Sequence, residues 1–362
     1  SLVAVGFKSL AGNTCGAQNV ALGTFTLTDN TTGNNNTAIG HQSMTDNTTA
    51  HCNTAVGACA LHANTTACNN TAVGMSTLIS NTTGIINTAV GAKAMCATTT
   101  GTRNTAMGRS ALAQNTSGSC NTGLGYLALN KNTTACLNTA VGSHSLYKNT
   151  TACRNTAVGA CSLYANTTGA ADTAVGFKAL VANTCGNSNT ASGAYSLFSN
   201  TTGSCNTAYG NESLFSNTTG RRNTAIGLRA LNNNTTSSYN TALGACALYA
   251  NTGYDNTAIG FRTLVTNTTG IRNTASGKYA LRDNTTGVKN IAVGTYSLMK
   301  NTTGHYNSAS GTYSLYNNTT GCYNNASGFE SLKNNTTANN NIAYGACSLY
   351  ANTTGADNVA VG

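Results

Sequence analysis

A glycine recurs every 17 residues along almost the whole chain, and this period constrains the fold more than any other feature. It closes a repeated T-A-V-G motif from Gly6 to Gly362, with one exception. Gly244 and Gly260 are 16 residues apart, because Asn251-Thr252-Gly253 replaces the usual N-T-T-G. The chain holds 21 repeat units, which predicts one continuous array rather than several globular domains.

The unit reads N-T-A-V-G-x-x-S-L-x-x-N-T-T-G-x-x, and its positions are numbered here from the glycine as zero. Position 4 is Leu in 19 units and Met in two, while position 15 is Ala in every unit but one, where Gly123 stands. Position 16 is usually Val, Ile or Leu. We expect these three columns to form the interior. Positions 1, 2, 5, 6, 11 and 12 carry nearly all charges and aromatic residues and should face outward.

This unit is too short for a helix-turn-helix repeat, which needs more than about 30 residues. Gly, Asn and Thr also interrupt every helical stripe. Two apolar segments remain, T-A-V-G and x-S-L-x, each followed by a turn rich in Asn, Thr and Gly. We predict an all-β parallel β-solenoid, or β-roll, of about 21 coils of 17 residues over residues 1–362, with two short strands per coil. Leu10, Leu27, Met44 and Leu61 should then be stacked.

The composition argues against an enzyme. Charged residues make up 7% of the chain, against about 25% in ordinary soluble domains. The five histidines have no recurring Ser, Cys or Asp partner, so we expect no catalytic residues, no cofactor and no metal site. The net charge of +10 is spread thinly, and no long apolar stretch occurs. We therefore expect neither nucleic-acid binding nor membrane insertion.

With its N-T-A-V-G-x-x-S-L-x-x-N-T-T-G units, the chain resembles repeats of tail-fibre-like and adhesin-like proteins of viruses and bacteria. It is also similar to the heads of trimeric autotransporter adhesins, whose shorter repeat carries a similar N-x-A-I-G element on a left-handed parallel β-roll. The resemblance implies an extracellular scaffold, on a cell surface, a secreted fibre or a virion. It also implies self-association, as a homotrimer or end to end. Since the chain begins and ends inside repeats, we expect a segment of a longer fibre.

The Asn-Thr-Thr element at positions 7 to 9 matches the acceptor for N-glycosylation, Asn-x-Ser/Thr, in surface turns. The acceptor occurs in 17 units. Its asparagines are Asn30, Asn47, Asn64, Asn81, Asn115, Asn132, Asn149, Asn166, Asn200, Asn217, Asn234, Asn267, Asn284, Asn301, Asn318, Asn335 and Asn352. The alternative is a structural ladder of stacked asparagines, since Asn also recurs at position 13, where no glycan can attach. Both interpretations remain open at this point.

The 14 cysteines occupy outward or turn positions, without the spacing of a zinc site. Cys136 and Cys153 stand one coil apart at position 11, within the range that a disulfide bond accepts. They are a candidate pair in an oxidising compartment. Alternatively, they are small residues that fill the turn.

We expect a structural extracellular fibre or spike-shaft segment, glycosylated along the Asn-Thr-Thr column. One alternative is a viral tail-fibre or adhesin shaft whose outward columns bind a receptor or glycan. Aromatic residues at position 5, such as Tyr147 and Tyr164, could stack on sugars or on each other. A second alternative is an ice-binding solenoid, disfavoured because the regular threonines flank asparagines in turns.

Overall fold

The computed structural model describes all residues from Ser1 to Gly362. The chain is all-β, with 22 strands and no helix, and it divides into two compact units, Ser1–Cys185 and Gly186–Gly362. The first unit contains β1 (Leu2–Val5), β2 (Asn19–Leu22), β3 (Thr37–Ile39), β4 (Thr54–Val56), β5 (Thr71–Val73), β6 (Thr88–Val90), β7 (Thr105–Met107), β8 (Thr122–Leu124), β9 (Thr139–Val141), β10 (Thr156–Val158) and β11 (Thr173–Val175).

The second unit is built from the same coil. It contains β12 (Thr190–Ser192), β13 (Thr207–Tyr209), β14 (Thr224–Ile226), β15 (Thr241–Leu243), β16 (Thr257–Ile259), β17 (Thr274–Ser276), β18 (Ile291–Val293), β19 (Ser308–Ser310), β20 (Asn325–Ser327), β21 (Ile342–Tyr344) and β22 (Val359–Val361).

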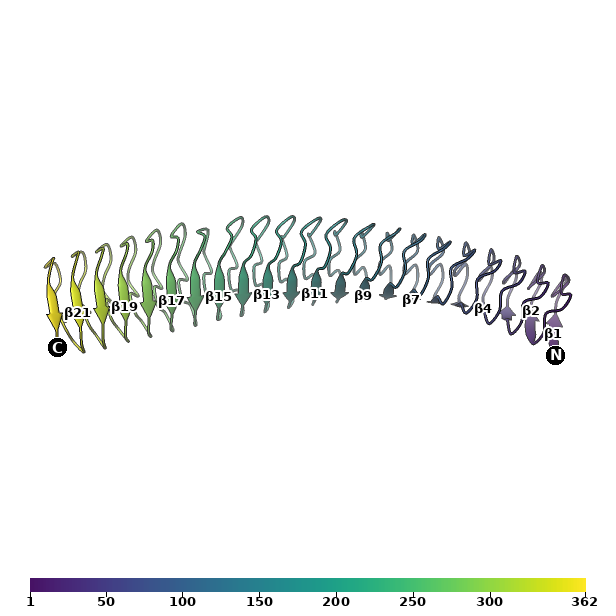
Figure 1. Ribbon diagram of the computed structural model, residues 1–362, viewed down its shortest axis with the longest axis horizontal. Coiled ribbons are helices and arrows are strands. Elements are labelled where there is room, and N and C mark those ends of the chain that lie inside the picture. Colours follow the sequence, from purple (N-terminus) through teal and green to yellow (C-terminus); the bar gives the residue numbers. More distant parts are fainter. The chain divides into compact units, whose positions relative to one another are not determined.

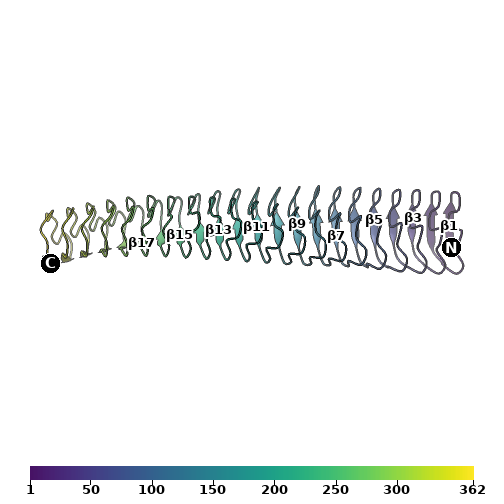
Figure 2. The same cartoon turned by 90° about the horizontal axis from the view of Figure 1, so that it is seen from above.

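Within each unit, every strand pairs in parallel with the strand of the next coil, and identical repeat positions are paired. Thr54 pairs with Thr71, for example, and Ala55 with Ala72. Figure 1 shows one arrow per coil, and in Figure 2 the strands of successive coils lie side by side. Leu27, Met44 and Leu61 are fully buried in successive coils. The predicted parallel β-solenoid is confirmed.

Each coil contains one strand rather than the predicted two. The x-S-L-x segment is a turn, because its residues at positions 2 and 4 adopt the left-handed conformation in every coil. Cys59 has a φ of 56° and Leu61 one of 50°, a region that few residues other than glycine enter. The Leu61 amide still donates to the Thr77 carbonyl oxygen of the next coil, at 3.0 Å. The segment is therefore bonded between coils without being extended.

The aliphatic column at position 16 faces outward, which corrects the predicted core. A three-residue strand turns only its middle side chain to one face, and that residue is the alanine of T-A-V. Ala157 is fully buried in β10, whereas Val158 is 36% exposed. The threonine at position 14 lies on the same outer face as the valine. The apolar interior therefore comes from Leu and Ala without the expected Val.

The recurring glycine is required both by its φ and by its close approach to the next coil. Gly57 has a φ of +138°, which residues with a side chain rarely adopt. A Cβ atom there would lie 2.5 Å from the carbonyl oxygen of Gly74. Any larger residue would push the neighbouring coil away, which explains why this position does not vary.

Asparagines at position 13 form part of a polar interior and bind both neighbouring coils. The backbone N–H of Asn138 donates to the Oδ1 atom of Asn121 in the preceding coil, at 3.0 Å. Its side-chain Nδ2 donates to the Ala152 carbonyl oxygen of the following coil, at 2.9 Å. Each asparagine of this kind therefore joins three coils, and half of the interior is polar and hydrogen-bonded.

Candidate functional site

The asparagines of the Asn-Thr-Thr column point into the coil rather than toward the surface, where a glycosylation acceptor would have to lie. All of the 17 candidate acceptors are fully buried except Asn352, which is half-buried. Asn47 donates from Nδ2 to the Oδ1 atom of Asn30, at 2.7 Å, and Asn149 repeats this bond to Asn132, at 3.0 Å.

The same Nδ2 atom also closes its own turn. That of Asn149 donates to the carbonyl oxygen of Ala152, three residues later, at 3.0 Å. A glycan on this nitrogen would replace one of the two N–H groups and place a sugar where the next coil packs. The geometry therefore favours the ladder over glycosylation.

The threonine after this asparagine also has a structural role. The hydroxyl of Thr31 donates to the carbonyl oxygen of Thr48 in the next coil, at 3.0 Å, and most coils repeat this bond. The Asn-Thr pair thus forms two parallel ladders. Hydrogen bonding between coils therefore explains why the first two residues of the acceptor motif recur, without any role for glycosylation.

Cys136 and Cys153 are both free thiols, as are the other cysteines. The Sγ atom of Cys153 accepts the backbone N–H of Cys136, at 3.0 Å. Asn34 and Ser119 accept in the same way, each from the residue one coil earlier. Position 11 thus favours a side chain that can accept a hydrogen bond, a preference that the variety of residues at this position conceals. The disulfide bond stays a prediction for an oxidising compartment.

The aromatic residues at position 5 stack on each other. The rings of Tyr147 and Tyr164 are 5.2 Å apart with an interplanar angle of 9°, and those of Phe198 and Phe215 are 5.0 Å apart at 3°. Each of these rings therefore presents one face to its neighbour. Of the two predicted alternatives, stacking on sugars or on each other, these two pairs show stacking on each other.

The coil that lacks one residue, residues 245–260 and called here the short coil, breaks the asparagine ladder. Asn251 donates from Nδ2 to the carbonyl oxygen of Gly253, only two residues later, at 2.7 Å. It does not reach the preceding coil, and the buried Oδ1 atom of Asn234 has no hydrogen-bond partner. The ladder resumes at Asn267, whose Nδ2 atom donates to the Oδ1 atom of Asn251 at 2.7 Å.

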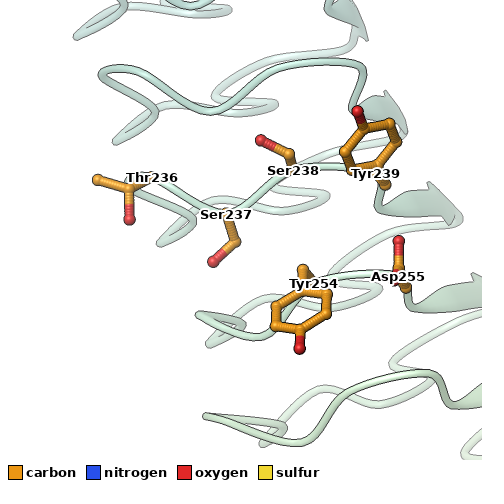
Figure 3. A pocket seen from close by; sticks show the side chains of 6 residues that line it. All are labelled: Thr236, Ser237, Ser238, Tyr239, Tyr254 and Asp255. Carbon is orange, nitrogen blue, oxygen red and sulfur yellow. The ribbon is translucent and has the colours of Figure 1, made fainter.

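A cavity of about 510 Å³ opens where the turn of the short coil meets the turn before it. Its lining residues are Thr236, Ser237, Ser238, Tyr239, Tyr254 and Asp255. Figure 3 shows the two tyrosine rings on neighbouring turns, with the Ser238 hydroxyl pointing away from Tyr239. Tyr239 is 54% exposed and Tyr254 is 45% exposed. We call this the short-coil cavity.

Arginines contact the residues on both sides of the short-coil cavity. Arg222 donates to the Tyr239 hydroxyl at 2.8 Å, and its guanidinium lies 5.5 Å from the centre of that ring. Asp255 pairs with Arg272, with 3.7 Å between Oδ2 and Nε. Exposed rings beside hydroxyl and carboxylate groups can hold a small polar molecule, which is the chemistry of a binding site.

The sequence contained a signal for this cavity, since the 16-residue step is the single irregularity of the period. Tyr239, Tyr254 and Asp255 were not predicted, because position 12 accepts many residue types and only the shortened turn brings them together.

No cluster of three or more His, Cys, Asp or Glu side chains is placed to hold a metal ion. No helix capable of crossing a bilayer is present. In comparisons with known proteins, the chain matches no family model and no curated sequence.

Proposed function

We propose that this chain is a structural shaft segment, and that it is not an enzyme. The observation that carries this proposal is the pair of buried asparagine ladders. They tie most coils to both neighbours with the same set of bonds, so the stability of the array is a sum of similar neighbour contacts. Such an array can be lengthened or shortened by whole coils without a change in its cross-section, which suits a spacer.

In-register deletion tests the shaft proposal. Removal of Ala58–Gly91, two whole coils, joins Gly57 to Ala92 and keeps every column in register. We expect a protease-resistant β protein that is shorter by about 10 Å. Removal of 25 residues, Ala58–Thr82, is the matched control and should abolish protease resistance. Equal resistance of both variants would contradict a shaft held together by register.

We also propose that the shaft is extracellular and not glycosylated at the buried asparagines. The location rests on the resemblance to surface fibres. Treatment of intact cells or particles that carry the protein with an amine reagent that does not cross membranes tests it, because only an outward-facing chain would be labelled on its lysines. The mass of the protein purified from a glycosylating host tests the second statement. A mass increase from sugars on Asn47 or Asn149 would overturn it.

We also propose that the outer strand face binds a second copy of the chain. From β3 to β11, positions 14 and 16 of this face carry no charged residue, and their aliphatic side chains are half-exposed or exposed. Uncharged apolar surface of this extent favours packing against a second copy. Lysine at both Val73 and Val141 should lower the mass seen in sedimentation equilibrium. Lysine at the exposed Ser143 is the control, and an equal effect of both changes would argue against this face.

A second candidate function is recognition of a receptor or glycan, and the short-coil cavity favours it. Two exposed tyrosine rings beside hydroxyl groups are a suitable surface for a neutral sugar. Insertion of one Thr between Thr252 and Gly253 would restore the regular turn and remove the cavity. Binding of the full chain to neutral oligosaccharides should be lost on this insertion. No binding by the unaltered chain, or equal binding by both, would exclude this role for the cavity.

A further inference from the structure

A second cavity, of about 250 Å³, lies in the unit Gly186–Gly362 and shares no residue with the short-coil cavity. Its lining residues are Arg229, Cys246, Tyr249, Arg262, Val265 and Arg282. They occupy positions 2 and 5 of successive coils, on either side of the position 4 leucine in the sequence. We call this the arginine cavity.

The arginine cavity has more positive than negative charge. The Nε atom of Arg229 lies 2.7 Å from Oε2 of Glu212, and Arg282 binds both oxygens of Asp283, at 2.7 Å each. Arg262 makes no ion pair, and its guanidinium lies 5.4 Å from the centre of the Phe261 ring. The three guanidinium groups therefore carry one positive charge more than the two carboxylates balance. The guanidinium group of Arg262 is exposed and available to an anion.

Charge of one sign in neighbouring coils is unfavourable for a stacked array, because like charges in register repel each other. Ion pairs account for Arg229 and Arg282, but Arg262 adds a positive charge that has no carboxylate partner. Guanidinium groups present planar donor pairs that match sulfate, carboxylate and phosphate oxygens. A cavity of about 250 Å³ is smaller than a typical site for a drug-sized ligand, and it suits one anionic group with part of its sugar.

Aromatic and basic residues continue from this cavity along the following coils. The rings of Tyr279 and Tyr296 are 5.5 Å apart, and those of Tyr296 and Tyr313 are 5.0 Å apart. Lys278 lies 5.3 Å from the ring centre of Tyr279, and Lys300, which makes no ion pair, lies 5.1 Å from that of Tyr316. Cations thus recur beyond the cavity, as a linear polyanion would require.

The same stacking argues against a nucleic acid. Single-stranded nucleic acids bind by placing their bases on free aromatic faces. Here the tyrosine faces are covered by neighbouring rings and by lysine ammonium groups, which leaves ring edges and hydroxyl groups for a ligand. These groups suit the hydroxyl-rich chain of a polysaccharide better than nucleobases.

We propose that the arginine cavity binds a sulfate or carboxylate group of a linear acidic polysaccharide, which extends along the tyrosines of the following coils. The site goes beyond the shaft role and does not rest on it, since a shaft without this ligand would remain a shaft.

Binding of the full chain to dextran sulfate tests this proposal, with neutral dextran, polyuridylate and inorganic sulfate as parallel probes at one salt concentration. We expect dextran sulfate to bind tightest and neutral dextran to bind far more weakly. Tighter binding of polyuridylate would overturn the polysaccharide assignment. Inorganic sulfate that binds as tightly, per sulfate, would reassign the cavity to a free anion.

The substitution Arg262→Gln should weaken dextran sulfate binding about tenfold, since a charge-assisted contact is lost. Arg262 is exposed, so we expect the variant to fold, and circular dichroism checks this. The control is Arg103→Gln, which removes another exposed arginine without an ion pair and lies in the other unit. Unchanged binding of the Arg262 variant, or equal losses in both variants, would refute a specific site.

Discussion

Two coils interrupt the asparagine ladder at position 7, and they do so in different ways. In the coil of residues 92–108, Thr98 replaces the asparagine at full length; we call this the Thr98 coil. The buried Oδ1 atom of Asn81 and the buried Oγ1 atom of Thr98 then lack partners. In the short coil the asparagine is present as Asn251 but displaced, and the Oδ1 atom of Asn234 lacks a partner.

The two interruptions have similar consequences inside and different ones outside. Both leave unpaired buried polar atoms, each of which costs about 1–3 kcal/mol. The short coil also has a shorter turn, and the cavity of about 510 Å³ opens beside it. A substitution therefore changes the stability of the array alone, whereas a deletion also changes its surface.

The largest effect is expected where the ladder is intact. Asn132→Ala removes the donor to Asn115 and the acceptor for Asn149. We expect it to lower the free energy of local opening by about 3 kcal/mol, because buried partners lose their bonds. Hydrogen exchange of the amides in that coil measures this. Thr98→Ala is the control, where the ladder is already broken, and it should change stability by less than about 1 kcal/mol.

Repair of the Thr98 coil comes next. Thr98→Asn supplies an Nδ2 donor for the unpaired Oδ1 atom of Asn81 and an acceptor for Asn115. We expect the free energy of local opening to rise by about 2 kcal/mol. The surface should stay the same, so binding of any ligand elsewhere should not change. A destabilised variant would show that this coil has adapted its packing to threonine.

Repair of the short coil should raise the free energy of local opening by less than repair of the Thr98 coil. Insertion of one Thr between Thr252 and Gly253 lets the asparagine donate to Asn234, but it also adds a residue whose freedom is lost on folding. We expect a gain of about 1 kcal/mol by hydrogen exchange. Loss of stability would mean that the shortened turn, with its Tyr254 and Asp255, is the more favourable one.

The smallest effect concerns Cys96 in the Thr98 coil. Burial raises the pKa of its thiol, whose Sγ atom lies 3.3 Å from the Ala113 carbonyl oxygen. A raised pKa means less thiolate at pH 8, so iodoacetamide should modify Cys96 a few times more slowly than the exposed Cys52. Peptide mass spectrometry gives both rates. Equal rates would indicate that the Thr98 coil opens readily.

The period predicted the fold because position 4 and position 15 tolerate almost no variation. It did not show that x-S-L-x is a turn, since leucine has no preference for the left-handed φ that Leu61 adopts. The outward direction of position 16 had a visible signal in Ser192, Tyr209 and Tyr344, which suit an outer face. The short-coil cavity could be located by its 16-residue step. Its lining depends on how two turns meet, which sequence alone does not give.

The ladder of position 13 asparagines sets the step in which this chain can change. Because each asparagine is bonded to the coils before and after it, a gene that duplicates or loses the codons of one coil leaves every bond in place. Loss of a single residue from one coil leaves an unpaired oxygen in the other ladder, that of position 7, as at Asn234. A gene for such a protein can therefore change in length by steps of 17 codons without breaking a bond. The short coil is the one place where a step of 16 residues occurs.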